Sequence, residues 1–236
     1  MKHNRAYYDQ FAARYEDERH RGYHALVDEL EVEMALRFAR GRRVLEAGCG
    51  TGLIMSRLRP HVASLAGVDL SSRMLAQAAA RQLAVVQGSV TALPFPDGEF
   101  DVVCSFKVLA HVERIGDALA ELSRVTRPGG HLVLEFYNPW SLRYLVKRLK
   151  PPTAISPDTD DEAVFTRYDT LPMIERALPP RHRVVDLRGV RVVTPLSAAY
   201  HAAPRLFGWL ERKACDTPVL RRLGGFLIVA VEKPRE

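Results

Sequence analysis

One short stretch limits what this 236-residue chain can fold into, because it joins an apolar strand to a glycine-rich turn. Val44–Ala47 carries an acid at its third position, Gly48–Gly52 alternates glycines with small residues, and Leu53–Met55 begins a helical pattern. A strand, a glycine turn and a helix start are typical of the first βα unit of a nucleotide-binding α/β sheet. The glycines let the backbone approach a ligand that a Cβ would exclude, and the new helix directs N–H groups at an anionic group.

Strand-like and helix-like segments alternate through the first 137 residues. Strands are predicted at 43–47, 65–70, 85–86, 100–105 and 131–137, and helices at 52–58, from Ser71 onward and at about 116–125. This alternation is typical of a parallel, doubly wound sheet. Two further strands are predicted at 182–193 and 226–232, and we expect the last strand to return to the same sheet.

Two amphipathic helices are predicted before the first strand, at 7–16 and at about 23–39. Tyr8, Phe11 and Tyr15 share one face of the first helix, a pattern that favours core packing over cofactor contact. We expect both helices to pack against the sheet or to cover its ligand edge.

Beyond residue 137 the pattern changes to helical inserts. A basic amphipathic helix is predicted at 141–150, an exposed mobile connection at 151–162, a helix at 170–178 and a largely helical segment at 195–223. We predict a single domain over 1–236. It would comprise N-terminal helices at 1–40, a cofactor-binding core at 41–137 and substrate-side inserts at 138–170 and 195–223.

Composition narrows the class of protein. The chain is 47% hydrophobic and 26% charged, which is ordinary for a globular protein, and a formal net charge of +6 is explained more simply by a solvated basic face than by an anionic partner. The three cysteines are widely spaced and form no CxxC pair, so they favour a reducing compartment over disulfides or zinc. With no signal-peptide pattern and no apolar run of membrane-spanning length, the sequence predicts a cytoplasmic protein.

The glycine spacing separates two classes of ligand. A dinucleotide turn reads GxGxxG and closes over a pyrophosphate, whereas here the third glycine comes one position earlier. Glu46 stands just before the turn, where its charge would oppose a phosphate but suit an ammonium group. Asp69 ends the second predicted strand and can accept hydrogen bonds from both ribose hydroxyls, although a helix N-cap is its structural alternative. S-adenosylmethionine, with its amino acid end, ribose and adenine, therefore fits better than NAD.

At these residues the chain resembles the class I S-adenosylmethionine-dependent methyltransferases, in particular the branch that modifies small molecules. The matching segments are 44–52, 67–71, 93–95, 100–103 and 127–130, in family order. The resemblance implies a Rossmann-like, doubly wound α/β fold with a seven-stranded sheet, mostly parallel with an antiparallel last strand, plus helical lid inserts. It implies S-adenosylmethionine as methyl donor and S-adenosylhomocysteine as product, and it is silent about the acceptor.

The resemblance also implies the cofactor contacts. The three glycines of the turn would line the methionine part near Glu46, Asp69 would hold the ribose, and Ser89 and Val90 would border the adenine. Relatives often carry Asp at the position of Ser89, so we expect somewhat lower affinity here. The predicted cofactor residues are Tyr15, Glu46, Gly48, Cys49, Gly50, Gly52, Asp69, Leu70, Met74, Ser89, Val90, Phe106 and Lys107.

The protein itself has to contribute little to the chemistry, because the sulfonium of S-adenosylmethionine already activates its methyl group. The chain must align the acceptor and exclude water, and a phenol or carboxylic acid acceptor needs its proton removed. His111 is the candidate base by position and ordinary pKa, with a structural histidine equally consistent with the sequence. Tyr137 and Asn138 are the candidate substrate contacts, and no metal site is predicted.

Three functions remain open. The first is methyl transfer to an O or N atom of a small, largely apolar molecule, and the second is C-methylation of a prenylated quinone or similar lipid-like acceptor. The third is a non-catalytic S-adenosylmethionine-binding partner protein. Residues 104–107 lack the Asn/Asp-Pro-Pro-Tyr motif of enzymes that methylate amino groups of nucleic acids, which argues against a nucleic-acid partner. The basic amphipathic inserts would roof an apolar pocket or contact an anionic membrane surface.

Overall fold

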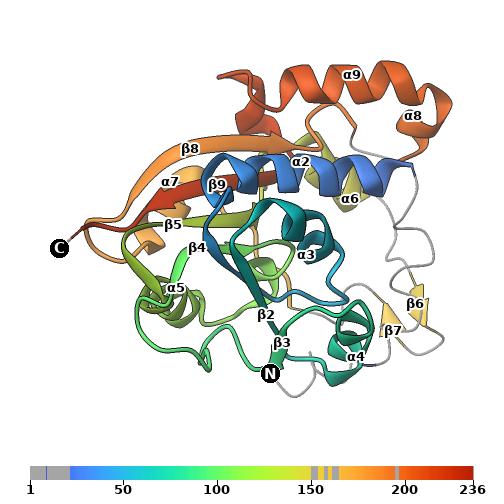
Figure 1. Cartoon of the computed structure of the whole chain (residues 1–236). Coiled ribbons are helices and arrows are strands. Elements are labelled where there is room, and N and C mark those ends of the chain that lie inside the picture. The colour runs from blue at the N-terminus through green and yellow to red at the C-terminus, as the bar shows by residue number, and fades with distance from the viewer. Residues whose placement is uncertain are drawn as a thin grey trace.

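Seven strands form one sheet in the order β3-β2-β1-β4-β5-β9-β8 (Figure 1). The computed structural model describes Asp9 and residues 22–149, 154–156, 159–160, 165–194 and 197–235. The strands are β1 (Arg43–Ala47), β2 (Ser64–Asp69), β3 (Val85–Gln87), β4 (Phe100–Ser105), β5 (Thr126–Tyr137), β8 (Arg183–Val190) and β9 (Phe226–Glu232). Strands β1 to β5 pair in parallel, whereas β9 runs antiparallel to both β5 and β8. The predicted sheet, with its antiparallel last strand, is confirmed.

The strand order fixes where a ligand can bind. The chain builds β1, β2 and β3 outward in one direction and then crosses back to place β4 on the other side of β1. In open α/β sheets, ligands bind outside the carboxyl ends of the strands where the strand order reverses. The ends of β1 and β4 therefore mark the expected site.

Helices cover both faces of the sheet. One face carries α2 (Tyr23–Ala39) and α3 (Leu53–Leu58), the other carries α5 (Ile115–Val125) and α7 (Leu171–Ala177), and α4 (Ser72–Ala80) packs beside α3. Val44 and Val102 point into the core under α2, while their neighbours Leu45 and Val103 point into the core under α5. The central strands read as continuous apolar runs because both of their faces are buried.

The insert between β8 and β9 adds an outer layer over α2 (Figure 1). It contains α8 (Ser197–Ala202), α9 (Pro204–Ala214) and the 3₁₀ helix η3 (Leu220–Leu223). Arg212 of α9 forms ion pairs of 2.5 Å with Glu29 and Glu33 of α2. The buried Glu211 accepts hydrogen bonds from the backbone N–H groups of Val192 and Val193. The predicted helical segment at 195–223 is thus fastened to the sheet domain.

After β5 the chain forms α6 (Leu142–Leu149), which matches the predicted basic helix closely. In the segment predicted as an exposed connection, β6 (Ala154–Ser156) and β7 (Thr159–Asp160) pair as a small antiparallel hairpin. Two short 3₁₀ helices, η1 (Arg59–His61) and η2 (Leu109–His111), complete the described elements. Every helix in the described ranges is too short or too polar to cross a bilayer.

The start of β5 and the end of β8 differ from the predicted strand boundaries, and most of one predicted helix lies outside the described residues. β5 begins at Thr126 and not at residue 131, because residues 127–130 bulge within the strand between the pairs Phe100–Thr126 and Val102–His131. β8 ends at Val190, after which Arg191 adopts a left-handed backbone conformation with φ 63°. The predicted helix at 7–16 lies outside the described residues except for Asp9, which is helical.

Candidate functional site

The glycine turn sits at the carboxyl edge of the sheet and packs tightly on two sides. A Cβ at Gly48 would lie 2.1 Å from Cγ2 of Val108, and a Cβ at Gly52 would lie 2.4 Å from Cδ1 of Leu83. At Gly50, with φ +53°, a Cβ would meet no described atom within 4 Å. The outer glycines therefore let the turn pack against its neighbours, while the middle one presents bare backbone to open space.

Asp69 links the glycine turn to the start of α4. Its Oδ2 accepts a hydrogen bond of 2.8 Å from the N–H of Gly50, and its Oδ1 accepts one of 2.9 Å from the N–H of Ser71. Burial raises the pKa of the Asp69 carboxyl, and the backbone hydrogen bonds from Ser71, Gly50 and Leu70 oppose that rise. Each carboxyl oxygen keeps a further lone pair, so the group can still accept from a ligand hydroxyl.

A cavity of about 330 Å³ opens beside this carboxylate. Its walls contain ten of the predicted site residues, namely Gly48, Gly50, Asp69, Leu70, Met74, Ser89, Val90, Phe106, Lys107 and His111. They lie at or after the ends of β1, β2, β3 and β4, except Met74, which lies on α4, so the topology gathers residues spread over 64 positions of sequence. These predicted cofactor residues and the candidate base thus line one cavity.

A second cavity, of about 30 Å³, adjoins the first below the turn and is lined by Glu46, Cys49, Asp28 and Lys107 among others. Glu46 is buried, and its Oε2 has no hydrogen-bond partner among the described residues. Burial and the neighbouring Glu31 raise the pKa of Glu46 well above its ordinary value, with Lys107 acting in the opposite direction. A buried carboxyl oxygen that lacks a donor suits a ligand ammonium group.

Cys49 shares this small cavity as a buried thiol. Burial and the nearby Glu46 carboxyl raise the pKa of the thiol far above its usual range. Because the thiolate is the reactive form, Cys49 is suited to filling space and not to nucleophilic attack.

Lys107 stands between the two cavities in a conformation that is rare for its residue type. Its φ is +58°, in the left-handed region, which costs a non-glycine residue free energy. Its ammonium group pairs with Asp28 at 2.9 Å and with Glu31 at 2.7 Å, both on α2. The sequence placed Lys107 beside the ligand, but its pairing with two acids of a distant helix was not predicted.

His111 lines the same cavity as Asp69. Its Nδ1 lies 3.0 Å from the backbone oxygen of Phe165, and since a carbonyl only accepts, Nδ1 carries the hydrogen. The lone pair of the neutral ring is then on Nε2. Burial lowers the pKa of His111 below its usual value, partly opposed by the Phe165 hydrogen bond and reinforced by Lys147. The ring is thus held in the neutral form that a proton acceptor requires.

Known proteins match this chain in sequence. Residues 45–134 fit the profile of a family described as methyltransferase domain. A demethylmenaquinone methyltransferase of Mycolicibacterium gilvum is 37% identical over 182 residues, which cover 72% of this chain and 80% of that protein. The chain belongs to the S-adenosylmethionine-dependent methyltransferases.

Other relatives align over a shorter span. A malonyl-[acyl-carrier protein] O-methyltransferase of Erwinia pyrifoliae is 35% identical over 137 residues, covering 57% of this chain and 50% of that protein. A demethylmenaquinone methyltransferase of Mycobacterium tuberculosis is 42% identical over 106 residues, covering 44% and 45%. The match thus spans about half the length of these two relatives.

Solved structures agree with the methyltransferase fold. A methyltransferase of Thermotoga maritima superposes with a TM-score of 0.67 at 18% identity, covering 96% of this chain and 98% of that one. A methyltransferase of Mesorhizobium loti gives a TM-score of 0.60 at 22% identity, covering 88% and 100%. At such identities the likeness concerns the fold alone.

The residues of the two cavities fit the family's cofactor, S-adenosylmethionine. The orphaned Glu46 oxygen suits the ammonium group, the open face of Gly50 leaves room for the methionine chain, and Asp69 can accept from the ribose. Leu70 and Met74 add apolar surface to the same cavity wall for a planar base. These residues therefore offer surroundings that suit the ammonium group, the ribose and the base of the cofactor.

Three predicted cofactor residues stand apart from this picture. Gly52 serves the packing of the turn against Leu83 and is not among the residues that line the cavity. The Ser89 hydroxyl lies 2.8 Å from that of Thr91 and accepts the N–H of Thr91, so it is engaged within its own turn. Tyr15 lies outside the described residues.

The two predicted substrate residues differ in their surroundings. The ring of Tyr137 stacks on Phe226 at 4.9 Å and meets His111 edge-on at 5.7 Å, which places it on the acceptor side. The amide of Asn138 donates to the backbone oxygens of Arg222 and Gly224 and accepts the N–H of Trp140. Substrate contact by Asn138 stays a prediction that this geometry does not favour, because its amide already holds the backbone.

Sequence reasoning missed some cavity residues. These are Gly88, Thr91, Val108 and Val112–Arg114. Val108 and Val112–Arg114 surround η2, the short helix that carries His111. The available signal was their position directly after a strand whose carboxyl end faces the ligand.

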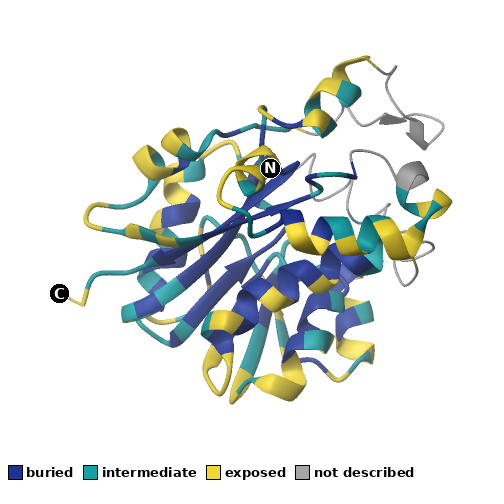
Figure 2. Cartoon of the chain, turned by 90° about the horizontal axis from the view of Figure 1, so that it is seen from above, coloured by how far each residue is buried: buried dark blue, intermediate teal, exposed yellow. Residues whose placement is uncertain are grey.

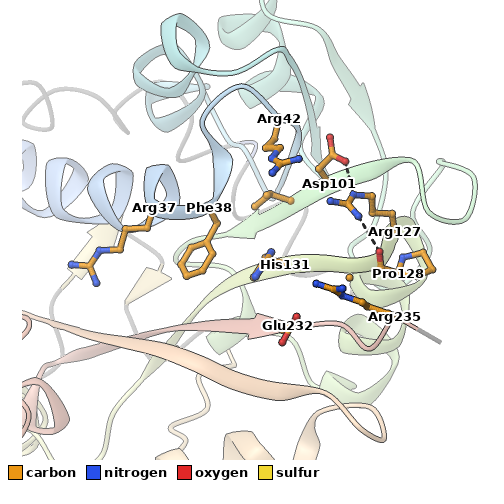
Figure 3. A pocket seen from close by; sticks show the side chains of 11 residues that line it. Arg37, Phe38, Arg42, Asp101, Arg127, Pro128, His131, Glu232 and Arg235 are labelled. Carbon is orange, nitrogen blue, oxygen red and sulfur yellow. Dashed lines mark hydrogen bonds and ion pairs between the residues drawn. The ribbon is translucent and has the colours of Figure 1, made fainter.

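A larger cavity, of about 580 Å³, lies at the opposite, amino edge of the sheet (Figure 3). Four arginines, His131, Asp101 and Glu232 are among its lining residues. Arg127 points at Asp101 across a 2.6 Å ion pair, and His131 lies beside the ring of Phe38 (Figure 3). The glycine turn and Asp69 are absent from its walls, so size alone does not identify the donor site.

Proposed function

We propose that this chain transfers the methyl group of S-adenosylmethionine to a small, largely apolar molecule. The observation that carries the proposal is that Asp69, Gly50 and His111, predicted for the cofactor and for proton transfer, line one cavity. When bound, the cofactor supplies a methyl group already activated by its sulfonium, and the electron pair of the breaking C–S bond leaves with sulfur.

The chain's own residues have to position the acceptor and dispose of its proton. Phe106, Val108 and Val112 give the cavity an apolar wall that keeps water from the reacting atoms. Nε2 of the neutral His111 accepts the proton of an acceptor hydroxyl, so that the oxygen lone pair attacks the methyl carbon. The proton then passes to solvent when the imidazole ring returns to its neutral form.

The acceptor atom divides two candidate functions. Transfer to an O or N atom is supported by the neutral His111, because hydroxyl and ammonium acceptors react once deprotonated. The O-methyltransferase of Erwinia pyrifoliae is a relative of this kind.

C-methylation of a prenylated quinone or similar lipid-like acceptor is the second candidate. It is supported by the relative of Mycolicibacterium gilvum, whose name gives a quinone as substrate and of which 80% aligns with this chain. The aromatic ring of Tyr137, which lies beside His111, suits a planar ring of this type.

One experiment tests both. The purified chain is incubated with donor carrying a ¹³C-methyl group and with a phenol, an amine, a malonyl thioester and a reduced demethylated quinone in turn. The carbon chemical shift of the labelled product tells whether O, N or C received the methyl group. Donor binding by calorimetry without turnover of any acceptor would instead support the non-catalytic S-adenosylmethionine-binding protein.

A further inference from the structure

The helix α6 presents its apolar side to solvent. Leu142, Leu145 and Leu149 are 51%, 57% and 86% exposed, and their spacing of three and four residues places them on one face. Trp140, just before the helix, is 73% exposed. A surface helix of a globular protein ordinarily buries such a face against the core.

The other side of α6 is polar and aromatic, and it is this side that meets the protein. The guanidinium of Arg143 lies 5.0 Å from the ring centre of Phe226 and 5.5 Å from that of Tyr137. The ring of Tyr144 lies 4.7 Å from that of Tyr168. The helix therefore faces outward with the side that would normally face inward.

Asn138 joins a second segment to this face. Its Nδ2 donates at 2.9 Å to the backbone oxygens of Arg222 and Gly224, while its Oδ1 accepts the N–H of Trp140 at 3.0 Å. These bonds hold the end of η3, with the exposed Leu223 and Arg222, against the start of α6. We call the set Trp140, Leu142, Leu145, Leu149, Arg222 and Leu223 the α6 surface.

The charges around the α6 surface select one kind of partner. Residues 139–150 contain four basic side chains and no acidic one. Arg148 and Arg222 are exposed beside the leucines. Leucine and tryptophan bordered by arginine and lysine are typical of helices that lie in the interface of an anionic membrane, where lipid headgroups neutralise the cations.

A chain of rings connects the α6 surface to the candidate base. Tyr144 of α6 contacts Tyr168 at 4.7 Å, Tyr168 contacts Tyr137 at 6.0 Å, and Tyr137 contacts His111 at 5.7 Å. The outward helix and the acceptor side of the cavity are thus continuous through aromatic side chains.

We propose that the α6 surface docks the protein on an anionic lipid bilayer. The leucines and Trp140 enter the acyl boundary, and Arg148 and Arg222 bind the headgroups. A lipid-soluble acceptor held in the bilayer is then presented on the side of the molecule where the ring contacts lead to His111. This presentation rests on the proposed function, whereas the docking does not.

Vesicle sedimentation tests the docking with two matched variants of the full chain. The first combines Trp140→Ser with Leu149→Ser on the α6 surface. The second combines Trp209→Ser with Leu206→Ser on α9, where both side chains are also exposed. Vesicles of phosphatidylglycerol with phosphatidylcholine are compared with phosphatidylcholine alone, each at low and at high salt.

The wild type and the α9 variant are expected to bind the anionic vesicles at low salt and to lose much of this binding at high salt. The α6 variant is expected to bind at least roughly tenfold more weakly, because it removes the two most exposed apolar anchors. Leu145→Asp alone, at another exposed position, is expected to weaken binding in the same way.

Three results overturn the docking proposal. They are no binding by the wild type, an α6 variant that binds as the wild type does, and an equal loss in the α9 variant. Ultracentrifugation without vesicles adds a fourth, since a wild-type dimer that dissociates in the α6 variant would assign this face to a second copy of the chain. Calorimetry with S-adenosylmethionine is run on every variant. Its failure in the wild type would overturn the proposed function while leaving the vesicle result to stand.

Discussion

At the scale of single residues, Asp69 joins ligand recognition to the architecture of the glycine turn. Asp69→Asn replaces one acceptor oxygen with a donor, which then faces a backbone N–H of Gly50 or Ser71 and offers the ribose a weaker partner. We expect the affinity for S-adenosylmethionine to fall by about 1.5–3 kcal/mol, or roughly tenfold to a hundredfold, by calorimetry. Asp101→Asn, at the opposite edge of the sheet, is the matched control and should leave the affinity unchanged.

The lowered pKa of His111 predicts how kcat/KM depends on pH. Because burial lowers its pKa, the proton-accepting form persists to lower pH than for an exposed histidine. The kcat/KM for a phenolic acceptor should therefore decline only as pH falls through a value below about 6.5. His111→Gln should lower turnover by roughly 10²–10⁴-fold and leave cofactor affinity intact.

The acidity of the acceptor supplies a control for this role. A nitrophenol that is already ionised near neutral pH should suffer much less from His111→Gln than an ordinary phenol. An equal loss for both acceptors would mean that His111 positions the acceptor and does not take its proton.

The raised pKa of Glu135 predicts how the stability of the fold depends on pH. Glu135 is buried on β5, where it meets the side chain of Glu31 and the backbone of Lys107. Burial raises its pKa well above 4.5, reinforced by Glu31 and opposed by Lys107. The folded state therefore holds a proton that the unfolded state releases above about pH 4.5, so stability declines as pH rises from there toward the folded pKa.

Glu135→Gln should flatten that decline, because glutamine has no proton to lose. Urea unfolding at several pH values between 5 and 8 measures the slope. The slope should not vanish, since Glu46 carries a raised pKa of its own. Identical slopes in the wild type and the variant would show that Glu135 ionises as easily in the folded chain as in the unfolded one.

At the scale of elements, different glycines of the glycine turn serve packing and ligand binding. Gly48→Ala drives a Cβ into Val108 at φ +82°, so we expect a loss of about 2 kcal/mol or more in the free energy of unfolding. Gly50→Ala meets open space and should cost only about 1 kcal/mol of backbone strain, yet it should weaken cofactor binding. Denaturant unfolding and calorimetry on both variants check this contrast, and a Gly50→Ala protein that binds the cofactor normally would contradict it.

The elements also show which parts of the fold and of the site could be predicted from the sequence alone. Helix α2 and strand β9 were predicted with the bounds that they have, because their apolar patterns are long and regular. Within the site, Glu46, Asp69 and the glycines belong to local motifs and could be named. The ion pairs of Lys107 with Asp28 and Glu31 join residues 79 and 76 positions apart, and no spacing reveals such a pairing.

A second limit of sequence reasoning is that it does not show which face of a helix packs against the protein. The amphipathic pattern of α6 was evident, but periodicity does not say which face meets the protein. Here Arg143 and Tyr144 pack against the neighbouring rings of Tyr137, Tyr168 and Phe226. The leucines of α6 therefore remain exposed. Figure 2 shows the strands of the sheet as mostly buried and the helices at the outside of the molecule with exposed residues.

At the scale of the whole molecule, the late insert is held as part of the domain. The carboxylate of Glu211 accepts from the N–H groups of Val192 and Val193 and from the hydroxyl of Thr194. Glu211→Ala would leave the N–H groups of Val192 and Val193 without this acceptor and should lower the free energy of unfolding by roughly 2–4 kcal/mol. Denaturant titration measures the loss, and cofactor affinity in the folded variant should be unchanged. A variant as stable as the wild type would identify 195–223 as a loosely attached lid.

The position of β9 within the sheet has a consequence for synthesis on the ribosome. It is the last of the seven strands to be made, yet it lies between β5 and β8, and β8 pairs with no other strand of the described sheet. Until residues 226–232 leave the exit tunnel, β5 has an open edge and β8 has no partner strand in the described sheet, and such edges invite pairing between chains. Neither β5 nor β8 can therefore complete its pairing until residues 226–232 have been made, and the growing chain is open to association with other copies for that interval.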